Sequence, residues 1–110
     1  MAKELLKKTN QNNMKLAKAL PDEMGGFMKL HDAALEEGAL DPKTKELIAL
    51  GISIAIKCEP CIVSHMDSLI ALDVSKEEIE ETIGVAFFMG GGPAVAYGGK
   101  ALAAYEELKK

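Results

Sequence analysis

The sequence predicts an all-α fold, and three observations lead to that prediction. Apolar residues make up 48% of the 110 residues and recur mostly at helical spacing. Helix start signals precede several of the apolar stretches. No segment is a convincing strand. We therefore expect a single domain over residues 1–110, in which about six helices pack around a core that needs no permanent disulfide.

Two helices are expected before residue 40. The first covers residues 3–19 and ends at Pro21, and its polar middle, TNQNN, is a weak point where it can bend. The second covers residues 22–37 and stops at Gly38. Acidic residues stand in its first turn, where they suit the positive end of the helix dipole.

The third helix begins with a clear signal. Asp41 suits the cap and Pro42 suits the first helical position, so the helix is predicted to run to about Lys57. A competing interpretation takes LIALGISIAI as a buried strand, because short apolar runs rich in β-branched residues fit either structure. The charged first turn favours the helix.

Three more helices complete the predicted bundle. One begins near Pro60 and covers PCIVSHMDSLIALD. The next has Ser75 and Glu78 in the pattern of a capping box, which fixes its start. The last begins again at Pro93 and ends in two lysines, whose positive charges suit a helix C-terminus.

Charge and hydropathy exclude several classes of function. The formal net charge is −4 and the chain contains no arginine, so nucleic acid is not expected as a ligand. The N-terminus lacks the apolar run of a secretory signal, and no apolar stretch spans a membrane without interruption. We therefore expect a cytoplasmic protein. The chain has more apolar surface than 110 residues easily bury, which predicts burial between copies in a homo-oligomer.

The only two cysteines lie in the stretch KCEPCIVSHMD. If a helix begins at Pro60, Cys58 lies at its cap and Cys61 in its first turn, where free backbone N–H groups stabilise a thiolate. Either sulfur fits the role of the attacking group. His65 follows Cys61 by four residues and can accept its proton. A thiolate, a base and a second thiol are the parts needed to reduce a peroxide or exchange a disulfide.

Glu46, on the preceding helix, is the carboxylate expected to orient His65. In an antiparallel hairpin, the helical rise places Glu46 about 17 Å and His65 about 8 Å from the turn. The axial gap of roughly 8 Å is too long for direct contact but fits a side chain plus one water. The sequence thus predicts a relay that runs through Glu46, a water, His65 and Cys61.

Glu46, eleven further residues and then CEPCIVSH resemble the signature of the alkylhydroperoxidase D family, within the broader carboxymuconolactone decarboxylase-like superfamily. The likeness extends from about Asp41 through FFMGGGPAVAYGGKAL, over half of the chain. The resemblance implies an all-α domain that assembles as trimers or hexamers and reduces hydroperoxides through a cysteine pair.

The resemblance also implies a role for each residue. Cys61 would meet the peroxide, Cys58 would resolve the product, and Glu46 and His65 would relay protons. A thiol or a dihydrolipoyl group on a carrier protein would supply the electrons, with no cofactor or metal ion. This chain has Pro60 where the best-known peroxidase of the family has a histidine. The decarboxylases of the superfamily lack the cysteine pair, so a lactone substrate is not expected.

Other interpretations of these residues remain open. The cysteines can be small buried apolar residues near a turn. A zinc site needs four ligands, of which the two cysteines and His65 supply three, with His31 or Glu46 as a remote fourth. The alternative function is therefore a non-enzymatic oligomeric domain that binds zinc or a small ligand. A thioredoxin-like domain would need strands around the motif. Glu46 can also be a solvated residue, and His65 a hydrogen-bonded histidine between helices.

Overall fold

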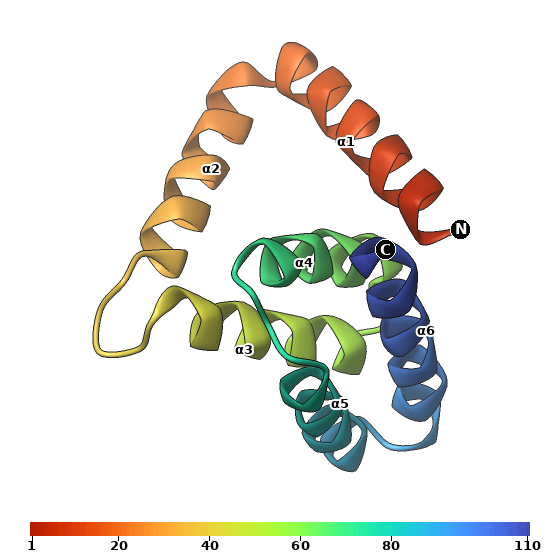
Figure 1. The fold of residues 1–110 in the computed structure, drawn as a ribbon. Helices are drawn as coiled ribbons and strands as arrows, with labels where there is room; N and C mark the ends of the chain where they lie inside the picture. Colours follow the sequence, from red (N-terminus) through yellow and green to blue (C-terminus); the bar gives the residue numbers. More distant parts are fainter.

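The computed structural model covers residues 1–110 and contains six helices and no strand (Figure 1). The all-α prediction and the number of helices are confirmed. None of the six combines the length and the apolar character needed to cross a bilayer. The helices are α1 (Ala2–Ala19), α2 (Pro21–Leu35), α3 (Pro42–Ala55), α4 (Glu59–Ala71), α5 (Lys76–Gly90) and α6 (Gly92–Lys109).

Helices α3 to α6 form the body of the molecule (residues 42–109), which encloses the main core. Helix α3 contacts each of the other three, and α6 contacts both α4 and α5. The core is apolar because each helix turns one face inward, with side chains three or four residues apart. Its largest fully buried side chains are Leu50, Ile54, Ile62, Met66, Leu69 and Ile79.

Side-chain caps fix where three helices of the body begin. The N–H of Thr44 donates to the carboxylate of Asp41 at 2.7 Å, at the start of α3. Ser75 and Glu78 form a reciprocal capping box at the start of α5. Cys58 caps α4. The predicted start signals are confirmed, because each depends only on residues three positions apart.

Helices α5 and α6 approach each other closely at a glycine. A Cβ atom on Gly98 would lie 2.7 Å from Cγ2 of Ile83, which is closer than carbon atoms pack. A Cβ atom on the neighbouring Gly99 would meet nothing within 4 Å. Gly98 therefore permits α5 and α6 to pack closely at this point.

Helices α1 and α2 form an arm (residues 2–35), in which α1 packs against α4 and α6 and α2 stands away from the body (Figure 1). Helix α1 runs unbroken through TNQNN, so the predicted weak point does not interrupt it. The backbone N–H groups of Ala2 and Lys3 donate to the carboxylate of Glu107, each at 2.9 Å, and fasten the arm to α6. Helix α2 contacts only α1 and α3, and none of its residues is buried.

Candidate active site

The turn between α3 and α4 places the cysteine motif. Helix α3 ends at Ala55, two residues before the predicted end, because Lys57 adopts a left-handed backbone with φ of 62°. The N–H of Cys58 then donates to the carbonyl of Ser53 at 3.0 Å and closes the end of α3. This bond fixes Cys58 as the residue from which α4 begins.

The two cysteines lie at the start of α4, as predicted. The Sγ atom of Cys58 accepts the backbone N–H of Cys61 at 3.3 Å. The two sulfur atoms are bonded to each other, with Cα atoms 5.3 Å apart. Both residues are partly exposed. On reduction, both sulfurs lie at a helix N-terminus, where unpaired N–H groups favour a negative charge.

His65 lies one turn after Cys61 and contacts Glu46 directly. Its Nδ1 is 2.6 Å from Oε1 of Glu46, so the predicted water between them is wrong. The reason is the early end of α3 at Ala55. By helical rise, Glu46 stands about 13.5 Å from that end and His65 about 9 Å from the start of α4. The two side chains span the remaining offset of about 4.5 Å.

Burial gives this pair a defined geometry. The side chain of Glu46 is only 8% exposed, which rules out a solvated carboxylate, and that of His65 is 24% exposed. A buried carboxylate needs a hydrogen-bond donor, which His65 supplies. When the Nδ1–H of His65 donates to Glu46, Nε2 is the ring nitrogen left free to accept a proton. Glu46 therefore fixes both the orientation and the tautomer of the imidazole.

The structure adds an ion pair at the motif that the sequence did not predict. Glu59 stands between the two cysteines, and its Oε1 is 3.3 Å from the Nζ of Lys100 on α6. The same Nζ lies 5.9 Å from the ring centre of Tyr97. Both ends of the ion pair are well exposed, so its energy is small. No local pattern signals it, because the partners are on different helices far apart in the chain.

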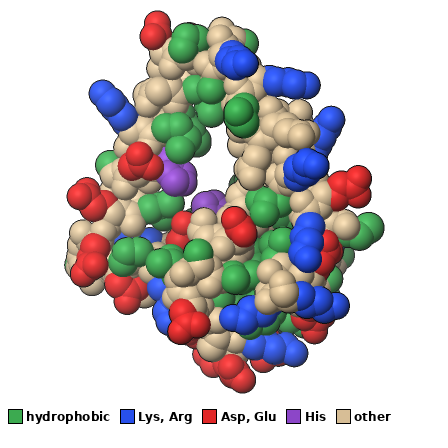
Figure 2. All heavy atoms as spheres, turned by 45° about the horizontal axis from the view of Figure 1, so that its top comes forward, with side chains coloured by type: hydrophobic (Ala, Val, Ile, Leu, Met, Phe, Trp, Pro, Cys, Tyr) green, Lys and Arg blue, Asp and Glu red, His purple; other side chains and the backbone are tan.

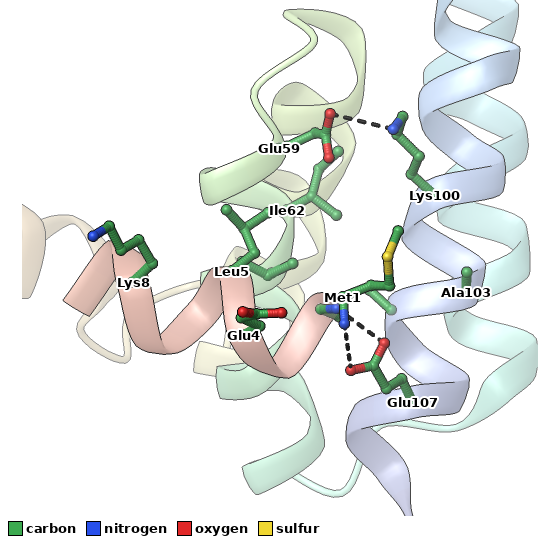
Figure 3. A pocket seen from close by; sticks show the side chains of 12 residues that line it. Met1, Glu4, Leu5, Lys8, Glu59, Ile62, Lys100, Ala103 and Glu107 are labelled. Atoms are coloured by element: carbon green, nitrogen blue, oxygen red, sulfur yellow. Dashed lines mark hydrogen bonds and ion pairs between the residues drawn. The ribbon is translucent and has the colours of Figure 1, made fainter. Parts of the chain in front are cut away.

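A cavity of about 650 Å³ lies between the first half of α1, the start of α4 and the second half of α6 (Figure 3). Leu5 and Ile62 contribute apolar walls, the pair of Glu59 and Lys100 stands at one end, and Glu107 stands at the other. None of the four residues predicted to be catalytic lines it. The cavity reaches the motif only through Glu59 and the first turns of α4.

The remaining candidate ligand lies outside the site. His31 is on α2, where its Nδ1 is 3.1 Å from Oδ1 of Asp32. No group of three or more His, Cys, Asp or Glu side chains is placed to hold a metal ion. The structure thus brings together Cys58 with Cys61 and Glu46 with His65, and it leaves His31 apart.

The fold and the site agree with a known family. The model of the carboxymuconolactone decarboxylase family matches residues 21–107. The chain belongs to this family. The matched region includes all four candidate catalytic residues and excludes α1.

Solved structures of carboxymuconolactone decarboxylase family proteins are similar over nearly the whole chain. One from Legionella pneumophila is 42% identical, with a TM-score of 0.96, and the match covers 99% of this chain and 97% of that one. One from Thermotoga maritima is 29% identical, with a TM-score of 0.84 over 96% and 90% of the two chains, and its description suggests a part in the antioxidative response. An uncharacterized protein of Cupriavidus necator is 31% identical over 96% of this chain and 94% of its own.

Proposed function

We propose that this protein is a thiol-dependent peroxidase that reduces alkyl hydroperoxides through Cys58 and Cys61. The observation that carries the proposal is a bonded cysteine pair at a helix start, followed one turn later by a histidine that a buried carboxylate holds. Each part has a chemical use in a two-thiol reduction. The family match and the suggested antioxidative part of the Thermotoga protein support the same chemistry.

In the first step, Cys61 attacks the peroxide. Nε2 of His65 takes the thiol proton, and the thiolate attacks the terminal oxygen of the hydroperoxide. The O–O bond breaks and an S–O bond forms, so Cys61 becomes a sulfenic acid while the peroxide is reduced to an alkoxide. The imidazolium of His65 returns its proton to the alkoxide, which leaves as the alcohol.

In the second step, Cys58 resolves the sulfenic acid. The Cys61 N–H that bonds to Cys58 Sγ stabilises the Cys58 thiolate, which attacks the sulfur of Cys61. The S–O bond breaks and the hydroxyl leaves as water, with the thiol proton of Cys58. The product is the disulfide seen in the structure. One dithiol or two monothiols must then exchange with this disulfide to restore both thiols, and we propose a dihydrolipoyl group or a small thiol as that reductant.

Glu46 acts as a positioning residue. It contacts neither sulfur, and its effect passes through the 2.6 Å hydrogen bond to His65. A carboxylate in this place keeps the proton on Nδ1 and stabilises the imidazolium that forms when Nε2 takes a proton. Without it, the imidazole can rotate or adopt the tautomer that has no acceptor at Nε2.

Mass spectrometry of the reduced protein tests the proposal. One equivalent of cumene hydroperoxide should remove about two mass units and join Cys58 to Cys61, with one equivalent of cumyl alcohol released. In Cys58→Ser the same dose should stop at a sulfenic acid on Cys61, which dimedone traps. Cys61→Ser is the matched variant and should neither consume peroxide nor react with dimedone.

Two results would overturn the proposal. If both thiols stay reduced after a stoichiometric dose of peroxide, the proposed peroxidase activity is ruled out. The second result concerns zinc. If the reduced protein as isolated binds one equivalent of zinc and Cys61→Ser binds none, the non-enzymatic metal-binding alternative is favoured. A dimedone adduct on Cys58 in the Cys61→Ser variant would instead exchange the roles of the two sulfurs.

A further inference from the structure

Helix α2 lacks the packing that a helix of its composition needs. Its 15 residues include no buried side chain, and it contacts only α1 and the neighbouring α3. Phe27, Met28 and Leu30 are all exposed. A helix of this length is marginal in water, and most helical stability in proteins comes from burying an apolar face. A partner surface for α2 is therefore missing within one chain.

The body has an exposed apolar stripe beside the candidate site. Ile48, Ile52 and Ile56 recur every four residues from α3 into its C-cap, and each is about half exposed or more. At 100° per residue, Ile56 lies about 60° and Ile52 about 100° around α3 from Ser53, which shares a face of the helix with Glu46. The stripe thus runs along the side of the site and ends two residues before the cysteine motif.

The space-filling view shows an opening between the arm and the body (Figure 2). Histidine side chains are visible on both sides of it, together with apolar side chains. The arm cannot easily close this opening by itself. Its first turn is bonded to Glu107 on α6, and its far end is joined to α3 by the short segment 36–41. Helix α1 also packs against α4 and α6, so α2 is the part of the arm that stands free of the body.

The accessible surface of this chain is larger than that of an average monomer of the same mass, and the difference is large enough for an interface between copies. The chain exposes 7012 Å². A monomer of this mass, 11.8 kDa, exposes about 5,900 Å² on average. The difference of roughly 1,100 Å² exceeds the approximately 800 Å² that each partner buries in a stable protein–protein interface.

We propose that α2 of a second copy of this chain lies over the Ile52 and Ile56 edge of α3 and covers His65. The catalytic role given to His65 rests on the proposed function, whereas the contact between copies does not. The site of one copy is then incomplete until the arm of another copy closes it. Phe27 and Leu30, three residues apart on α2, supply the apolar contacts.

A second copy fits this surface better than an unrelated protein. Every chain carries both an unpartnered helix and an exposed apolar edge, so a symmetric exchange satisfies both at once. The charges also match: α2 carries Asp22, Glu23 and Asp32 against one lysine, and Lys57 beside Ile56 has no ion-pair partner. Covering the site would keep water from the imidazole and the thiolate, which strengthens their interaction.

Sedimentation of the unmodified chain is the first test. The mass should correspond to an assembly of two or more copies at micromolar concentration. The double variant Phe27→Asp with Leu30→Asp should sediment as a single chain. Asn12→Asp with Asn13→Asp adds the same two charges to the arm on exposed α1 positions and should keep the assembly. Unmodified protein that sediments as one chain overturns the proposal without any variant having to fold.

Complementation between variants is the decisive test. The double α2 variant should lose at least about tenfold in peroxidase rate, because its site stays open. Cys61→Ser has an intact arm but no attacking thiol. Mixing the two should restore activity, since the Cys61→Ser arm covers the intact site of the other chain. A mixture that stays inactive, although the two chains associate, overturns the contact in trans.

A second readout separates failure of this contact from failure of the proposed function. Iodoacetamide should alkylate the reduced thiols of the double α2 variant faster than those of the unmodified protein, and addition of Cys61→Ser should slow that reaction again. If the thiols in the mixture are protected from alkylation but no peroxidase activity is found, the contact between copies is supported and only the proposed function is ruled out. Equal alkylation rates in all samples would overturn the contact.

Discussion

The body and the arm are built from helices of similar length but differ in how those helices are held. Three of the four body helices begin with a side-chain cap, whereas neither α1 nor α2 has one. The body encloses the main core, and the arm buries only Ala2. All four candidate catalytic residues belong to the body. The well-packed part of the chain thus holds the candidate site, while the arm depends on contacts outside itself.

The strongest way to sharpen this contrast is to disturb the site without disturbing the core. Glu46→Gln keeps the size of the buried side chain but removes the charge that holds His65. We expect kcat/KM for hydroperoxide to fall by about 10²-fold or more, because the imidazole loses its orientation and tautomer. Stopped-flow peroxide consumption measures this. Glu80→Gln, an exposed carboxylate of the body, should change the rate by less than about twofold.

A core truncation compares the stability of the two regions directly. Leu50→Ala removes a fully buried side chain of the body and should lower the free energy of unfolding by about 2–5 kcal/mol. Leu16→Ala, at an exposed position on the arm, should change it by no more than about 0.5 kcal/mol. Urea titrations followed by circular dichroism give both values. Equal losses would show that the arm is as well packed as the body.

Adding one methyl group probes the close contact between α5 and α6 at Gly98. Gly98→Ala places a carbon against Ile83 and should destabilise the fold by about 1–3 kcal/mol. Gly99→Ala meets open space in the same helix and should instead stabilise it by up to about 1 kcal/mol. Thermal unfolding of the pair measures the difference. The same sign for both would mean that α5 and α6 are not in close contact at Gly98.

The smallest expected effect concerns the capping box of Ser75 and Glu78 at the start of α5. The N–H of Ser75, with the ammonium of Lys43 as the second cause, holds the pKa of Glu78 below its ordinary value of 4.5. A lowered folded-state pKa stabilises the fold above the ordinary value, and this stabilisation is lost as the pH falls through the folded-state pKa. Glu78→Gln should therefore lose less stability between pH 7 and pH 3 than the unmodified protein. Urea midpoints at the two pH values measure it, with Glu80→Gln as the matched variant.

Local signals in the sequence were sufficient to predict the helices and their starts. Asp41, Ser75 and Cys58 each cap a backbone N–H three residues on, so neighbouring residues determine the contact. The distance between Glu46 and His65 was predicted wrongly because it depends on where α3 ends. That end is set by the left-handed backbone of Lys57, a conformation that a lysine does not signal.

Tertiary arrangement was the part that local patterns could not supply. The arm was predicted as two ordinary helices of the bundle. Phe27 and Leu30 have the spacing of a core-facing stripe, yet both are exposed. Periodicity shows that a face is apolar but not which surface covers it. The same limit applies to Lys100, whose partner Glu59 lies on another helix.

The cap formed by Cys58 ties the oxidation of this protein to its secondary structure. A thiolate at that position places a full negative charge at the N-terminus of α4. A disulfide sulfur there is only a weak acceptor. Folding therefore favours the dithiol over the bridged state, compared with an unstructured CEPC peptide. Electrons should therefore pass from the reduced peptide to the oxidised folded chain when the two are mixed.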